Sequence, residues 1–169
     1  MFSFNNPLGA CPDCTGLGSF MQADPDLIVE DTGKSLNEGA INGAGWKFAE
    51  KSSWARSFIE ALSTRYKFSL DTPWFELSEE VQNIILYGND GEEIKVDTSN
   101  SRYARGKDYY SAWEGVIPSV MRRYTESGSG DLKEYYEDYM SEIICESCNG
   151  ARLRPASLGV TYNDTNIYD

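Results

Sequence analysis

The stretches "CPDCTGLGSF" (Cys11–Phe20) and "CESCNGARLR" (Cys145–Arg154) hold all four cysteines of the chain. Each is a Cys-x-x-Cys pair followed by x-Gly, and about 130 residues separate the two pairs. Two residues between cysteines let both sulfurs face one ion from a tight turn, and four thiolates form the ligand set of a closed tetrahedral zinc site. The sequence therefore predicts a structural zinc that joins both ends of the chain, with the ligands Cys11, Cys14, Cys145 and Cys148.

Two glycines support this prediction, because Gly16 and Gly150 each follow the second cysteine of a pair by two residues. A residue at that place often needs a positive φ, so that backbone N–H groups turn toward the sulfurs. Zinc with four thiolates carries a charge of −2, which those N–H groups, with Arg152 or Arg154, would offset. A structural zinc of this kind can contribute on the order of 10 kcal/mol to folding.

Three other readings of the cysteines remain open at this point. Redox pairs of the thioredoxin type would require a βαβ context, which the sequence does not predict. An iron-tetrathiolate electron carrier also uses paired Cys-Pro-x-Cys turns, but in a much smaller domain. Disulfides are rare in cytosolic proteins.

Composition excludes several classes of function. The chain has no histidine, so Ser-His and Cys-His catalysis are excluded, and so are histidine metal ligands. Its net charge of −12 argues against a domain built mainly to grip phosphate backbones, although a local basic face is compatible with it. No apolar run approaches the roughly 20 residues of a membrane span, and the N-terminus lacks the features of a signal peptide. We therefore expect a soluble, cytoplasmic protein with no membrane partner.

Apolar periodicity predicts an α+β fold that is mainly helical, with a small β-hairpin. One helix is expected over residues 52–68, capped by Ser53, and a second begins after Ser78 and ends at Gly88. Asn89-Asp90-Gly91 is turn chemistry and begins the hairpin, which is expected to reach residue 110.

Two further helices are predicted after the hairpin. The third begins at Tyr109 or Pro118 and reaches about Glu126, and the fourth begins with Asp131 as part of a capping box. Apolar residues of the fourth helix keep helical spacing as far as Ile144, so that it would deliver Cys145 at its end. The short run 27–29 is expected to be a strand.

The charge is unevenly distributed along the chain. Residues 102–123 carry five bases against two acids, interleaved with tyrosines. Arginine and tyrosine together suit phosphate contacts and base stacking, although the default reading of such a pattern is a solvated helix face with local salt bridges. The candidate DNA contacts are Arg105, Lys107, Arg122 and Arg123. Gly33-Lys34-Ser35 is similar to the end of a phosphate-binding loop but lacks the preceding glycine, so we read it as an exposed loop.

Three longer stretches resemble one known family. They are "FSFNNPLGACPDCTGLG" (2–18), "WEGVIPSVMRRYTES" (113–127) and "CESCNGARLRPASLGV" (145–160). Together they resemble the first half of UvrA, the A subunit of the bacterial excinuclease ABC, and the resemblance covers essentially the whole chain. It implies an ATP-binding-cassette half interrupted by an insertion domain that a four-cysteine zinc module holds. The implied division is a first knuckle at 1–18, the insertion domain at 19–143, and a second knuckle with a return strand at 144–169.

The resemblance also implies a function and partners. UvrA proteins are dimeric ATPases that recognise damaged double-stranded DNA in nucleotide excision repair and load UvrB. This chain has no Walker A, Walker B or ABC signature sequence, so we expect an excised fragment that is not itself an enzyme, and ATP would bind only in the full-length protein. An accessory DNA-contact domain is the first hypothesis. The alternatives are a structural or protein-interaction module without direct DNA contact, and a thiol-redox or chaperone-like zinc protein.

Overall fold

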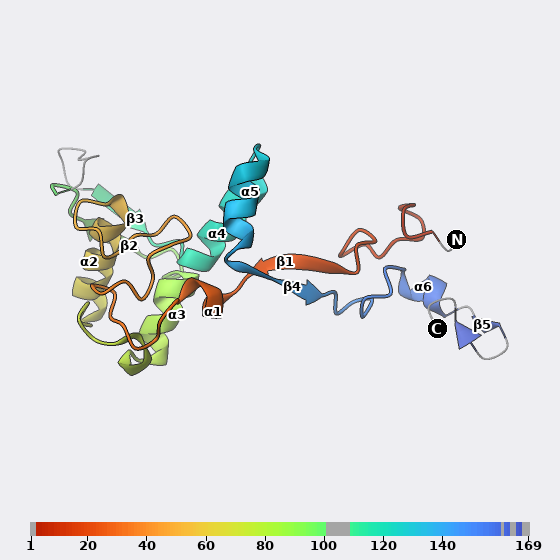
Figure 1. Cartoon of the computed structure of the whole chain (residues 1–169), viewed down its shortest axis with the longest axis horizontal. Coiled ribbons are helices and arrows are strands. Elements are labelled where there is room, and N and C mark those ends of the chain that lie inside the picture. Colours follow the sequence, from red (N-terminus) through yellow and green to blue (C-terminus); the bar gives the residue numbers. More distant parts are fainter. Residues whose placement is uncertain (1–2, 101–108, 160, 163–164, 167–169) are drawn as a thin grey trace. The chain divides into compact units, whose positions relative to one another are not determined.

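The computed structural model describes residues 3–100, 109–159, 161–162 and 165–166 (Figure 1). These residues belong to two compact units, Met1–Gln22 with Ser141–Asp169, and Ala23–Met140. The predicted α+β class is confirmed, because small two-stranded sheets accompany six α-helices in the described part of the chain. None of those helices is long and apolar enough to cross a membrane. The three-part division expected from the sequence stays a prediction.

The unit Ala23–Met140 contains most of the helices. Serine caps begin two of them as predicted, since Ser53 and Ser78 accept hydrogen bonds from the backbone N–H groups of the first turns. The β2–β3 pair is the predicted hairpin, and it is antiparallel with Lys95 opposite Tyr110. The elements are α1 (Pro25–Ile28), α2 (Trp54–Tyr66), the 3₁₀ turn η1 (Trp74–Glu76), α3 (Glu79–Tyr87), β2 (Glu93–Val96), β3 (Tyr109–Ala112), α4 (Val116–Glu126) and α5 (Gly130–Glu137).

An aromatic cluster forms the centre of this unit. The rings of Trp46 and Trp113 meet edge to face with centroids 4.8 Å apart, and Phe58 lies 5.5 Å from Trp113. Both indole N–H groups are satisfied: that of Trp113 donates to the Ile85 carbonyl at 3.1 Å, and that of Trp46 donates to the Ser119 hydroxyl at 3.2 Å. The cluster therefore packs large apolar area without leaving a buried donor unpaired.

The predicted third helix is corrected at its start. Residues 109–112 form strand β3, and the helix begins at Val116, two residues before Pro118. Pro118 is tolerated as the third residue of the helix, because the first N–H groups of a helix have no intrahelical partner and a missing one costs nothing there.

The prediction for the fourth helix is wrong beyond Glu137. Ser129 caps α5 in place of Asp131, and the residues after α5 form strand β4 (Met140–Ile144). The apolar stripe is no continuous buried face, since Leu132 is 51% exposed and Ile144 is 65% exposed. Strand β1 (Ser19–Ala23) pairs with β4, and this long-range ladder overrides the local helical spacing. Residues 25–28, which overlap the expected strand at 27–29, form the short helix α1 instead.

The unit Met1–Gln22 with Ser141–Asp169 has little regular structure. Its elements are most of β1 and β4, the short helix α6 (Pro155–Leu158), and the antiparallel pair β5 (Thr161–Tyr162) and β6 (Thr165–Asn166). Its buried cluster consists of the four cysteines and Ala151, with Leu158 packed against them. Such a core is too small to stabilise a unit by apolar burial alone.

Candidate metal centre and nucleic-acid surface

All four cysteines lie at the same end of the two-stranded ribbon formed by β1 and β4, before β1 begins and after β4 ends (Figure 1). Cys11 and Cys14 precede β1, and Cys145 follows β4 directly, where its N–H donates to the Gly18 carbonyl at 2.9 Å. The cysteines are between 0 and 3% exposed, and none forms a disulfide. The ribbon therefore brings together the two pairs that the sequence places at opposite ends of the chain.

The sulfur positions suit a tetrahedral ion. All four Sγ atoms lie within 4.8 Å of one another, with Cys11 and Cys145 3.9 Å apart and Cys14 and Cys148 3.7 Å apart. Four sulfurs around zinc, each at about 2.3 Å from it, stand about 3.8 Å apart. The separations are far longer than the roughly 2.05 Å of an S–S bond. The four cysteines are thus arranged to hold one metal ion.

The two knuckles repeat the same backbone conformation. The first, second and fourth residues after Cys14 all have positive φ, and so do the equivalent residues after Cys148. Gly16 and Gly150 have φ of 82° and 81°, as their place in the motif predicts. The knuckles also exchange reciprocal hydrogen bonds. The Cys11 N–H donates to the Arg152 carbonyl and the Cys145 N–H donates to the Gly18 carbonyl, both at 2.9 Å. These backbone hydrogen bonds hold the two Cys-x-x-Cys pairs side by side without any contribution from a metal ion.

Hydrogen bonds to sulfur prepare the thiols for a cation. Burial opposes ionisation of Cys14, but N–H donation from Gly18 (3.2 Å) and Gly16 and the neighbouring thiols outweigh it and lower its pKa to about 7. Burial raises the pKa of Cys148 to about 11, and the adjacent thiols of Cys14 and Cys145 add to the rise. Clustered thiolates repel one another, and a divalent cation would offset that repulsion. The donor set therefore fits zinc.

The two arginines expected near the metal have different roles. Arg154 donates from its side chain to the carbonyls of Ala10 (3.1 Å) and Pro7 (2.7 Å), so it ties the N-terminal segment to the second knuckle. Arg152 contributes backbone groups to the repeat, and its guanidinium lies 5.6 Å from the centre of the Phe4 ring. Sequence reasoning missed Gly18, whose carbonyl accepts the hydrogen bond from Cys145. The signal that could have indicated it is its place in the repeat, because Gly18 follows Cys14 by four residues as Arg152 follows Cys148.

The basic window is only partly described. Arg105 and Lys107 lie outside the described residues, in the segment that joins β2 and β3. Arg122 and Arg123 lie on α4. Arg122 makes two hydrogen bonds to Glu114 and one to Glu126, and these lower the pKa of Glu114 and raise that of Arg122. The helix face thus includes the local salt bridges that the sequence left as an alternative.

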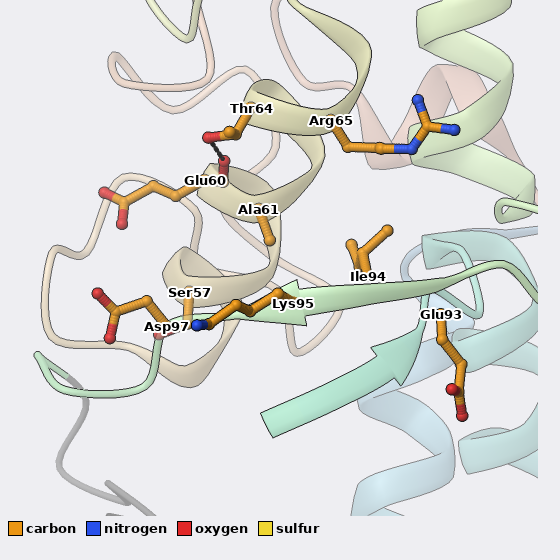
Figure 2. Close-up of a pocket in the computed structure, with 9 residues that line it drawn as sticks. All are labelled: Ser57, Glu60, Ala61, Thr64, Arg65, Glu93, Ile94, Lys95 and Asp97. Carbon is orange, nitrogen blue, oxygen red and sulfur yellow. Dashed lines mark hydrogen bonds between the residues drawn. The ribbon is translucent and has the colours of Figure 1, made fainter. Parts of the chain in front are cut away.

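A groove beside the hairpin does not select a ligand by charge. It lies between α2 and β2, has a volume of about 660 Å³, and is drawn in Figure 2, where Ala61 and Ile94 point toward one another. Arg65 pairs with Glu92 at 2.6 Å, and the lining carries charges of both signs, two bases and three acids. The lining residues are Ser57, Glu60, Ala61, Thr64, Arg65, Glu93, Ile94, Lys95 and Asp97.

Comparison with known proteins matches both units of the fold. A family model described as the UvrA DNA-binding domain matches residues 24–138. UvrABC system protein A of Micrococcus luteus is 44% identical over 171 residues, which is 99% of this chain and 17% of that protein. The Clostridium tetani protein of the same name is 41% identical over 100% of this chain and 18% of its own length. The chain therefore spans less than a fifth of these relatives.

One solved structure agrees with the whole chain. The crystal structure of UvrA2 from Deinococcus radiodurans superposes with a TM-score of 0.76 at 26% sequence identity. The match covers 99% of this chain and 21% of that one.

Proposed function

The chain belongs to the UvrA DNA-binding domain family, and from this premise we propose that it is an accessory DNA-contact domain of a UvrA-type protein of nucleotide excision repair. The observation that carries the proposal is the family match over residues 24–138, which nearly coincides with the compact unit Ala23–Met140. Duplex DNA, damaged DNA in particular, is the proposed ligand. The proposed contacts are Arg105, Lys107, Arg122 and Arg123.

The metal in this proposal is a structural zinc held by Cys11, Cys14, Cys145 and Cys148. When bound, zinc supplies a charge that neutralises two of the four thiolates and leaves no open position for chemistry. The chain's own residues would orient the sulfurs through the two knuckles. The ion would thereby fix both ends of the inserted unit, which makes 19–143 the proposed insertion domain.

The whole protein supplies the rest of the proposed activity. In a UvrA-type protein, ATP binding and hydrolysis would lie outside these residues, and so would the contacts with UvrB and with a second UvrA subunit. We place such a protein in the cytoplasm, where the DNA is. No catalytic residue is proposed within this chain.

A charge-reversal variant tests the DNA contact. We expect the zinc-loaded chain to bind a duplex weakly, with affinity that falls steeply as salt rises. Arg122→Glu with Arg123→Glu should lower the affinity about tenfold or more at low salt, measured by fluorescence anisotropy. Lys34→Glu with Lys51→Glu makes the same charge change elsewhere and should cost much less.

The outcomes separate the hypotheses. Equal losses in both double variants would mean that net charge, and no particular surface, governs the binding. Full retention by the first variant would remove Arg122 and Arg123 from the interface. A folded chain that binds no duplex even at low salt would overturn the proposal and favour a module that only positions other parts of its protein.

A further inference from the structure

Two adjacent arginines of α4 have opposite surroundings. Arg122 donates from Nε to Glu114 at 2.8 Å, from Nη2 to the same carboxylate at 3.0 Å, and from Nη1 to Glu126 at 3.1 Å. Three of its five N–H donors are thus occupied by two carboxylates. The trio carries a net charge of −1, so an approaching phosphate would meet repulsion and would have to displace a bidentate partner.

Arg123 lies against an aromatic ring, whereas Arg122 lies against carboxylates. Its guanidinium carbon lies 4.9 Å from the centre of the Trp46 ring. Among the residues that the structure describes, no carboxylate comes within ion-pair distance of Arg123, and its N–H groups make no hydrogen bond. Its positive charge helps to lower the pKa of Glu114, behind the hydrogen bond and the charge of Arg122. A partly buried cation with all its donors available is poised for an anion.

The platform under Arg123 is rigid. Trp46 is 7% exposed, its indole N–H donates to Ser119, and its ring packs against Trp113. Stacking on a ring face leaves the N–H edges of a guanidinium free to point outward. The cation is therefore held in one orientation without using the groups that bind phosphate.

Gly45 shapes the seat for this guanidinium. A Cβ built on Gly45 would lie 2.1 Å from the Nη1 atom of Arg123, and its φ is +81°. The Gly45 N–H donates to the hydroxyl of Tyr135 at 3.2 Å, which fixes the turn against α5. The absence of a side chain at residue 45 leaves room for the Arg123 guanidinium over the Trp46 ring.

We propose that Arg123, seated on Trp46, is the phosphate contact of α4, and that Arg122 is held by its own carboxylates and contributes little to binding. This inference rests on the proposed function and narrows it, because of the two α4 arginines named there it keeps only Arg123 as a DNA contact. It adds Trp46 and Gly45 as the residues that position the contact. It predicts unequal roles for two neighbours that are identical in type and one residue apart.

Single neutralising variants distinguish the two arginines. In the zinc-loaded chain, Arg123→Gln should weaken duplex binding about tenfold at low salt and reduce the slope of log K against log salt by about 1, the change expected for one lost phosphate contact. Arg122→Gln should change the affinity less than about threefold and leave the slope unchanged. Arg123→Lys should keep the slope, because the charge stays, but bind more weakly because lysine cannot stack and fork in the same way.

The salt slope is the measurement that a merely structural arginine would not change. If Arg123→Gln destabilises the fold, Arg123→Lys still tests the inference through its slope and affinity, with circular dichroism reporting the fold. Equal effects of the two Gln variants, or a larger effect at Arg122, would overturn the inference while DNA binding persists. A folded wild-type chain that binds no duplex would instead overturn the proposed function, so the two failures are distinguishable.

Discussion

Chelation of the metal is expected to unfold the unit made of Met1–Gln22 with Ser141–Asp169 and to leave Ala23–Met140 folded. The buried cluster of the first unit consists of four cysteines and one alanine, so without the ion the stability of this unit would fall by on the order of 10 kcal/mol. The second unit keeps its own core around Trp113. Limited trypsin digestion should then cut after Arg152, whereas cleavage within the second unit should stay as it was before chelation. Elemental analysis should find one zinc per chain before chelation.

A matched pair of variants at one knuckle controls for general damage. Cys148→Ser removes a ligand, so it should abolish stoichiometric zinc binding and expose the Arg152 site to trypsin without any chelator. Ser147→Ala removes only a hydroxyl that bonds to Asp13 at the surface, and should retain zinc. Isolation of the protein without metal, or the same resistance to trypsin before and after chelation, would contradict a structural zinc at the four cysteines.

The metal site was predictable because its chemistry is local. Cys-x-x-Cys spacing and the glycine two residues later specify a turn that needs no knowledge of the rest of the chain. The reciprocal bonds between the knuckles were not predictable, because they join backbone atoms of segments far apart in sequence. They follow only once β1 and β4 are known to pair.

The secondary structure was likewise predictable where local contacts determine it and not where distant ones do. The caps Ser53 and Ser78 act within four residues, and both helices begin where the sequence indicates. Strand β4 has helical spacing, yet it pairs with β1, a partner that periodicity cannot reveal. Local pattern thus predicted elements that local contacts stabilise, and it failed where a distant strand decides.

The basic window shows why residue type alone does not assign a contact. Glu126 lies four residues after Arg122, so that ion pair could have been foreseen from helical spacing. The stack of Arg123 on Trp46 joins a helix to a turn far away in sequence, and no spacing rule indicates it. Sequence therefore treats the two arginines as equivalent, whereas their environments differ.

Replacing Gly115 by alanine is expected to destabilise the unit Ala23–Met140 by more than about 3 kcal/mol, near the upper end of single-residue effects. Its φ is +93° and its ψ is 151°, a conformation open almost only to glycine. A Cβ there would lie 2.4 Å from the Tyr87 carbonyl carbon and 2.5 Å from the Gly88 nitrogen. Both are backbone atoms that cannot rotate away, so the segment that contains Gly115 and the segment at residues 87–88 would have to move apart. Urea unfolding followed by circular dichroism measures the loss.

Two other glycines separate the clash from the backbone strain. Gly91 has a φ of +79° but no atom within 4 Å of an added Cβ, so Gly91→Ala should cost only the roughly 1–2 kcal/mol of a left-handed residue. Gly128 has neither a positive φ nor a close neighbour, and Gly128→Ala should be close to neutral. The close approach of the backbone at Gly115 to residues 87–88 also positions Trp113, whose backbone N–H donates to the Asn89 side-chain oxygen at 2.9 Å. Separating the two segments should therefore weaken the aromatic cluster and reduce the near-ultraviolet signal. If Gly115→Ala were no more destabilising than Gly91→Ala, the close approach of the two backbones would be refuted.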